Sequence, residues 1–118
     1  NKNESFVNAV IREMKEETGL DIYNPKLCGI EQFSLDEQTR YLVLLFKTNQ
    51  FSGILKSSIE GEMMWISRND LKKYNLVKNF NDVLKIFDNG EINELFYNSN
   101  DTLFPKYYYF GNRFSNST

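Results

Sequence analysis

The chain has 118 residues, a length that suits one compact domain, and 41% of them are hydrophobic. This content supplies a buried core and excludes an intrinsically disordered chain, which combines low hydrophobicity with a high net charge. The formal net charge of −2, from 14 basic and 16 acidic residues, argues against binding to a nucleic acid polymer, and the lack of a long apolar run argues against a membrane span.

Cysteine and histidine usage narrows the chemistry further. Cys28 is the only cysteine and the chain has no histidine. An internal disulfide is therefore impossible, and we expect a cytoplasmic setting with Cys28 as a buried structural residue. The lack of histidine also excludes Ser-His-Asp triads and most zinc sites. Any metal must be held by carboxylates and carbonyls, which favours Mg²⁺, Mn²⁺ or Ca²⁺.

The first expected element is a helix over residues 5–17. Its apolar residues from Val7 to Met14 recur at i, i+3, i+4 and i+7, and therefore form one stripe. Gly19 stands where a helix C-cap is expected. An extended segment over residues 20–22 and a turn at Asn24-Pro25 should follow.

The rest of the chain predicts strands and a second helix. The run RYLVLLFKT is nearly continuously apolar, so we expect a central strand that is buried on both faces. In chain order the expected elements are strands over 26–33 and 40–48, a turn over 49–53, a short strand over 62–67, a helical turn over 68–74, an amphipathic helix over 80–87 ending near Asn89-Gly90, and an edge strand at Tyr107–Phe110. The mixture indicates an α/β fold with helical layers on a mixed sheet.

Three glutamates share one face of the first helix. Glu13, Glu16 and Glu17 are spaced i, i+3 and i+4, where like charges repel each other. A divalent cation would remove this repulsion, and Arg12 can pair with Glu16 four residues later. Taken alone, the three glutamates also fit a solvated helix face laced with ion pairs.

The wider segment resembles the Nudix box of the Nudix hydrolase family. Glu4 is followed by seven residues and then Arg12-Glu13, with Met14 in the apolar slot, Glu16-Glu17, and finally Gly19-Leu20. The resemblance implies a Nudix fold, an α/β/α sandwich with a mixed sheet. The opening glycine of the box would lie before residue 1, so we expect residues 1–118 to be the C-terminal portion of a single Nudix domain, without its N-terminal strands.

The resemblance also implies roles for residues of the box. Glu13, Glu16 and Glu17 are the expected Mg²⁺ ligands, with Mn²⁺ as the alternative ion, and Arg12 is expected to orient them. Helix geometry would place Glu4 on the opposite side, so a structural role is expected for it; this argument weakens if Glu4 lies in the loop before the helix. Family members often carry another acidic residue downstream.

Glu60 is the preferred candidate for that downstream ligand or base, and Glu62 is the second. A solvated acidic turn is the other interpretation of this pair. The implied reaction is attack of water on phosphorus in a diphosphate linkage, with the metal neutralising charge and activating the water. The usual products are a nucleoside monophosphate and pyrophosphate.

The stretch from Arg40 to Phe87 is similar, more weakly, to the MutT-like 8-oxo-dGTP diphosphatases of low-GC Gram-positive bacteria. In that branch, amide or acid side chains near the start of the second helix bind the oxidised purine. The candidates here are Asn79, Asn81 and Asp82, for which helix N-capping by either asparagine is the alternative. ADP-ribose or dinucleoside polyphosphates remain possible substrates, and a catalytically silent nucleotide-sensing domain is the competing class.

Aromatic residues leave two interpretations open. Trp65 and Phe80 could stack on a base, although packing in the core is the more common role of such residues. The cluster Tyr107–Phe110 is expected in sheet packing or in a homodimer contact rather than in base stacking.

Overall fold

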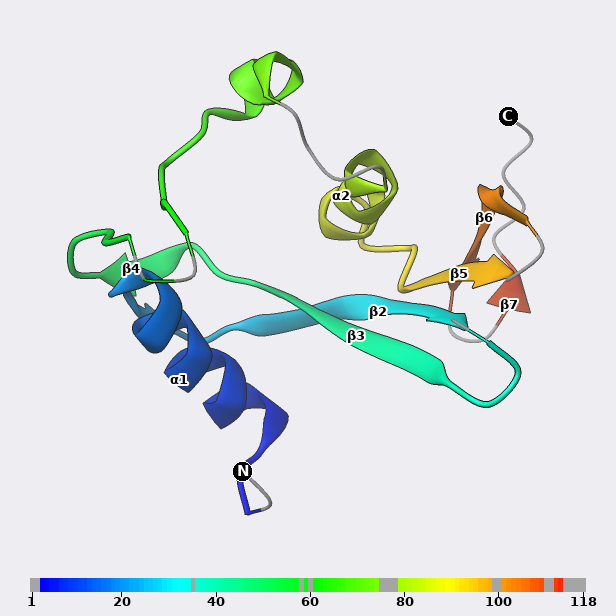
Figure 1. Cartoon of the computed structure of the whole chain (residues 1–118), viewed down its shortest axis with the longest axis horizontal. Coiled ribbons are helices and arrows are strands. Elements are labelled where there is room, and N and C mark those ends of the chain that lie inside the picture. The colour runs from blue at the N-terminus through cyan, green and yellow to red at the C-terminus, as the bar shows by residue number, and fades with distance from the viewer. Residues whose placement is uncertain are drawn as a thin grey trace. The chain divides into compact units, whose positions relative to one another are not determined.

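The computed structural model describes residues 3–34, 36–57, 59, 61–74, 79–98, 101–109 and 112–113 (Figure 1). The chain is mixed α/β and forms two compact units. Unit 1 comprises Asn1–Lys26 and Phe46–Leu76, and unit 2 comprises Leu27–Leu45 and Val77–Thr118. None of the helices in the described part of the chain is long and apolar enough to span a membrane.

Unit 1 begins with the expected helix, α1, which spans Phe6–Thr18. Ser5 caps its N-terminus, because its side chain accepts a hydrogen bond from the backbone N–H of Asn8 at 3.0 Å. Gly19 ends the helix in the left-handed conformation, with φ of 80°, and its N–H donates to the Lys15 carbonyl. The capping residues therefore fix the length of the helix that carries the box glutamates.

The helix is followed by a two-stranded sheet. Strand β1 (Asp21–Tyr23) pairs antiparallel with β4 (Gln50–Ser52), with Ile22 opposite Phe51. The turn expected over residues 49–53 is thus wrong in part, because residues 50–52 form a strand with a distant partner, which local patterning does not reveal. Leu20 and Ile22 are buried in this unit.

The strand expected over residues 62–67 is also wrong, since this segment has no regular structure. Serine side chains bind the backbone at both of its ends: Ser57 Oγ accepts from the Met63 N–H, and Ser67 caps the following helical turn. That turn, η1, is a 3-10 helix over Arg68–Lys73 and confirms the expected one.

Unit 2 contains a mixed five-stranded sheet in the order β3-β2-β5-β6-β7. Its strands are β2 (Lys26–Ser34), β3 (Arg40–Lys47), β5 (Glu94–Asn98), β6 (Asp101–Tyr109) and β7 (Asn112–Arg113). β2 and β5 are parallel, whereas β6 is antiparallel to both β5 and β7. The tail strand is therefore flanked on both sides and is not the expected edge strand, while Phe110 lies outside the described residues.

β3 has the expected extent but a different position. It lies at one end of the strand order, and the side chains of Tyr41 and Leu42 are exposed, Leu42 to 63%. The expectation of a central strand buried on both faces is wrong for the described sheet. A continuous apolar run reports what a strand could bury but not which strand will pair with it.

Helix α2 spans Phe80–Asp88, and Asn89 is its C-cap, as expected. The core of unit 2 lies between this helix and the sheet. The buried core residues are Leu45, Ile86, Ile92, Leu95 and Tyr97. Cys28 is half-buried and packs against this cluster. Gly29 of β2 allows the close approach of α2, because a Cβ there would lie 2.7 Å from Ile86 Cγ2.

Candidate active site

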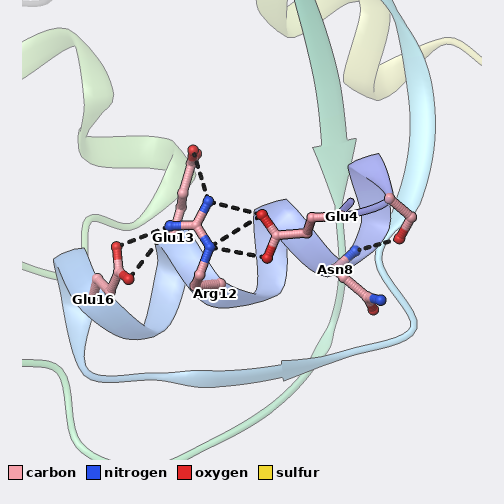
Figure 2. Close-up of polar contacts among 6 residues, drawn as sticks. Glu4, Asn8, Arg12, Glu13 and Glu16 are labelled. Atoms are coloured by element: carbon pink, nitrogen blue, oxygen red, sulfur yellow. Dashed lines mark hydrogen bonds and ion pairs between the residues drawn. The ribbon is translucent and has the colours of Figure 1, made fainter. Parts of the chain in front are cut away.

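The guanidinium of Arg12 joins carboxylates from two turns of α1 and from the segment before it (Figure 2). Nε and Nη2 donate to Glu4, at 2.9 Å to Oε2 and 3.0 Å to Oε1. Nη1 donates to Glu16 Oε2 at 3.2 Å, and Nη2 lies 3.9 Å from Glu13 Oε1. The pairing of Arg12 with Glu16 expected from their spacing is confirmed.

Glu4 is not on the helix, which corrects the expectation that it occupies the opposite side of α1. It precedes the N-cap Ser5, and from there its carboxylate reaches Arg12 across two turns. The hydrogen bonds from Arg12 lower the pKa of Glu4, and in return Glu4 and Glu16 raise the pKa of the guanidinium. Arg12 is thus permanently charged and bound on two sides, which limits its rotation.

The box glutamates differ in what they contact. The Glu13 and Glu16 side chains are 57% and 61% exposed, each on the Arg12 side of the helix. Glu17 is exposed too, and no basic group of the described residues lies within ion-pair distance of it. On this helix, Glu17 therefore has no described partner, whereas the neighbouring Glu13 and Glu16 both pair with the Arg12 guanidinium.

The donor set suits a hard divalent cation, because Glu13, Glu16 and Glu17 supply only carboxylate oxygens on one helix face. Among the described residues, no three acidic, cysteine or histidine side chains yet converge as metal ligands would. The Glu13 and Glu16 carboxylates are exposed on the side of α1 where Arg12 is anchored by Glu4, so a cation from solvent can reach them there. The residues present therefore fit a hard divalent cation.

The downstream acidic candidates belong to the segment between β4 and η1. Glu60, the preferred one, lies outside the described residues. Glu62 is exposed in unit 1. Trp65, expected more often in a core, is 64% exposed and rests against Phe51 with ring centroids 5.1 Å apart. Phe80 is half-buried at the start of α2 in unit 2.

A second group of polar side chains gathers in unit 2 around the start of α2. Asn79 Nδ2 donates to the Glu31 carboxylate on β2. Asp82 Oδ2 accepts from the Tyr97 hydroxyl at 2.7 Å, and its Oδ1 accepts from the Tyr107 hydroxyl at 3.4 Å. We refer to these five residues as the Asp82 cluster. It includes two of the three expected substrate-binding residues.

The third, Asn81, is exposed on α2 and makes no hydrogen bond with the described residues of the cluster. The alternative that Asn79 serves as a helix cap is wrong, because it stands at the N-cap position but its side chain makes no capping bond. Its amide is committed to Glu31 instead.

Burial and charge perturb the cluster. Glu31 is only 6% exposed, and burial together with the nearby Asp82 charge raises its pKa, although the Asn79 hydrogen bond opposes this. Burial and Asp82 also raise the pKa of Tyr97, and they raise the pKa of Tyr107 to about 12. Both phenols therefore stay protonated at neutral pH and donate to Asp82.

Three members of this cluster were not among the substrate-binding residues expected from the sequence. Glu31 carried a signal, since the alternation of side chains along a strand puts this acid on the same face as Gly29 and Phe33. Tyr97 had none, because β5 was not expected as a strand. Tyr107 was expected in sheet packing, and it does pack against the core while its hydroxyl reaches Asp82.

Comparison with known proteins decides the family. The model of the NUDIX domain matches residues 1–87, which is most of the chain. The chain belongs to the Nudix family. Within the Nudix family it is 28% identical over 93 residues to the uncharacterised Nudix hydrolase YvcI of Bacillus subtilis (strain 168). That match covers 75% of this chain but only 59% of the relative's length.

The fold agrees with this assignment. The crystal structure of the mutator MutT protein from Bacillus halodurans superposes with a TM-score of 0.74, covering 91% of this chain and 76% of that one at 23% identity. The mixed α/β arrangement is thus that of a Nudix fold, and the expected MutT-like resemblance is confirmed at the level of family and fold.

Proposed function

We propose that this Nudix chain supplies the catalytic helix of a Mg²⁺-dependent hydrolase that cleaves the diphosphate linkage of a modified nucleoside triphosphate such as 8-oxo-dGTP. The products are the monophosphate and pyrophosphate. The observation that carries the proposal is the Arg12 guanidinium, which binds Glu4 and Glu16 while Glu17 stays exposed beside them. The MutT name of the B. halodurans structure supports the choice of substrate class.

The box residues divide the work. Glu13, Glu16 and Glu17 would hold the ion, with Glu60 as the further ligand or base and Glu62 as the second candidate. Bound Mg²⁺ would neutralise the diphosphate and lower the pKa of a water molecule. Arg12 keeps Glu13 and Glu16 on one side of α1, so little reorganisation is needed when the substrate arrives. A carboxylate accepts the proton of the attacking water.

The Asp82 cluster is the proposed base-binding part. Asn79 and Asp82 offer an amide and a carboxylate close together on one turn of α2, and these groups suit the polar edge of a purine. Asn81, which lies outside the cluster, is the weaker candidate. A cytoplasmic location belongs to the same proposal, supported by the single cysteine, and so does a homodimer built on the tyrosine-rich tail.

The test is Mg²⁺-dependent hydrolysis by the full-length protein of 8-oxo-dGTP, dGTP, ADP-ribose and a dinucleoside polyphosphate, measured side by side. Glu16→Gln is the inactive comparison, expected to lower turnover at least about 100-fold because it removes one ligand charge. Glu37→Gln is the matched control, since Glu37 is an exposed acid outside both sites. Mn²⁺ in place of Mg²⁺ tests the choice of ion.

Preference for 8-oxo-dGTP together with the loss in Glu16→Gln would support the proposal. Preference for ADP-ribose or a dinucleoside polyphosphate would keep the reaction and replace the substrate. Normal turnover in Glu16→Gln and in Glu17→Gln would refute the ligand assignment. Nucleotide binding without any hydrolysis would indicate a sensing domain.

A further inference from the structure

Glu31 is a buried acid that none of the assigned roles uses. It lies on β2, 6% exposed, and the backbone register places it beside Leu95 of the parallel strand β5. An ionised carboxylate can only accept hydrogen bonds, and a buried one without a donor is costly. Glu31 obtains its donor from Asn79 Nδ2. The carboxylate therefore dictates which end of the Asn79 amide faces it.

An amide held by its nitrogen presents its oxygen elsewhere. No donor among the described residues bonds to Asn79 Oδ1, and the described part contains no polar side-chain atom that is both buried and unpartnered. Oδ1 of Asn79 thus reaches solvent. Asp82 is equally restricted to accepting, and it already receives the hydroxyls of Tyr97 and Tyr107. The open positions of the Asp82 cluster are therefore acceptors.

We propose that Glu31 is a positioning residue: by holding Asn79 Nδ2 it fixes Asn79 Oδ1 as an acceptor, so that the cluster selects a base whose edge carries hydrogen-bond donors. A guanine-type base presents a ring N–H and an amino group along one edge. An adenine-type base presents a donor beside an acceptor, which an amide matches only when its own donor is free. Glu31 takes one N–H of the Asn79 amide, and a hydrogen bond from the same side chain to the Tyr97 hydroxyl oxygen engages the other, so neither N–H is left for a base. The proposal rests on the proposed function for the location of the base.

The face of the sheet strengthens the assignment to Glu31. Glu94 is another partly buried acid of the same sheet, but it is opposite Ile30 in the register and bonds to Gln32 at 2.5 Å. Side chains alternate along β2, so Ile30 and Gln32 lie on the opposite face from Glu31. Glu94 is consequently outside the Asp82 cluster and provides a matched acid on the other face.

The experiment is calorimetric binding of dGMP and dAMP to the full-length protein, with wild type, Glu31→Gln and the control Glu94→Gln. We expect wild type and Glu94→Gln to favour dGMP by roughly 10-fold or more, as sites built on hydrogen bonds reject mismatched partners. In Glu31→Gln the new amide can bind Asn79 in either orientation, so the ratio should fall to within about 3-fold and the affinity for dAMP should rise. Each ratio comes from one protein sample, so a partly unfolded variant does not distort it.

Asn79→Ala is a second variant, chosen because Asn79 makes no capping bond and its loss should leave α2 folded. It should lose the same preference. A wild type without preference, binding of neither nucleotide, or a full preference retained in Glu31→Gln would overturn the proposal. Since binding needs no turnover, a protein that prefers dGMP but hydrolyses nothing would refute the proposed function and leave the role of Glu31 standing.

Discussion

Gly29→Ala should destabilise the protein by wedging helix α2 away from the sheet. The added Cβ would lie 2.7 Å from both Ile86 Cγ2 and the Asn93 carbonyl oxygen. Carbon atoms in favourable contact are about 3.5–4.0 Å apart, so the neighbours would have to withdraw by about 1 Å. Ile86 is 1% exposed and Asn93 is fixed by backbone bonds to Ile30 and Tyr108, which leaves little room for this.

The expected magnitude follows from overpacking. An extra carbon in a packed core costs about 1–3 kcal/mol, and replacing glycine recovers up to about 1 kcal/mol through the unfolded chain. We expect a net loss of about 1–2 kcal/mol. A chain of 118 residues has an unfolding entropy of roughly 0.25 kcal/mol/K, so the melting temperature should fall by about 4–8 °C.

The assay is thermal unfolding of wild type and Gly29→Ala, with Gly90→Ala as the matched control. A Cβ at Gly90 meets no atom within 4 Å, so that variant should melt within about 2 °C of wild type. An unchanged melting temperature in Gly29→Ala would contradict the close packing of α2 on β2. Equal losses in both variants would show that the steric argument does not discriminate between the two sites.

Three further outcomes follow from the two polar sites. Arg12→Lys should lower turnover by about 10–100-fold and raise the Mg²⁺ concentration needed for half activity, because one ammonium group cannot hold both Glu4 and Glu16 as the guanidinium does. An unchanged Mg²⁺ dependence would argue against an orienting role for Arg12. Folding raises the pKa of Glu31 above 4.5, so the stability that Glu31 contributes is present below that pH and is lost as pH rises. Urea titrations should therefore show the free energy of unfolding of Glu31→Gln rising relative to that of wild type from pH 4 to 7. A difference that stays constant over this range would count against burial of the charge. Folding also raises the pKa of Tyr107, to about 12, so wild type should lose stability between pH 10 and 12 and Tyr107→Phe should lose less. A tyrosinate absorbance change for Tyr107 near pH 10 would contradict its burial.

Local signals in the sequence predicted the elements that depend on local interactions. The N-terminal helix is fixed by the Ser5 cap, its apolar stripe and Gly19, all of which lie within the helix or next to it. The Arg12–Glu16 pair is also local, since it spans one turn. The spacing of the box residues could therefore be converted directly into geometry.

Local signals could not predict which strands pair when the partners are far apart in the sequence. β3 was expected at the centre of the sheet because its side chains are apolar, yet strand order depends on partners elsewhere in the chain. β5 was not expected at all, and without it Tyr97 could not be placed beside Asp82. The expected position of Glu4 was wrong for a different reason. Ser5, the next residue, caps the helix, so helical geometry does not apply to Glu4.

The parallel pairing of β2 with β5 has a consequence for how the protein is made. Ile30 is opposite Glu94, so the contact cannot form until the chain beyond Glu94 has left the ribosome. Joining such distant segments carries a loop-closure cost that local contacts avoid, and parallel strands are slow to find each other. Until then the edge of β2 that later binds β5 remains an open template for other strands. The helix with the box glutamates can form early, whereas the Asp82 cluster can assemble only after Tyr107 has been synthesised.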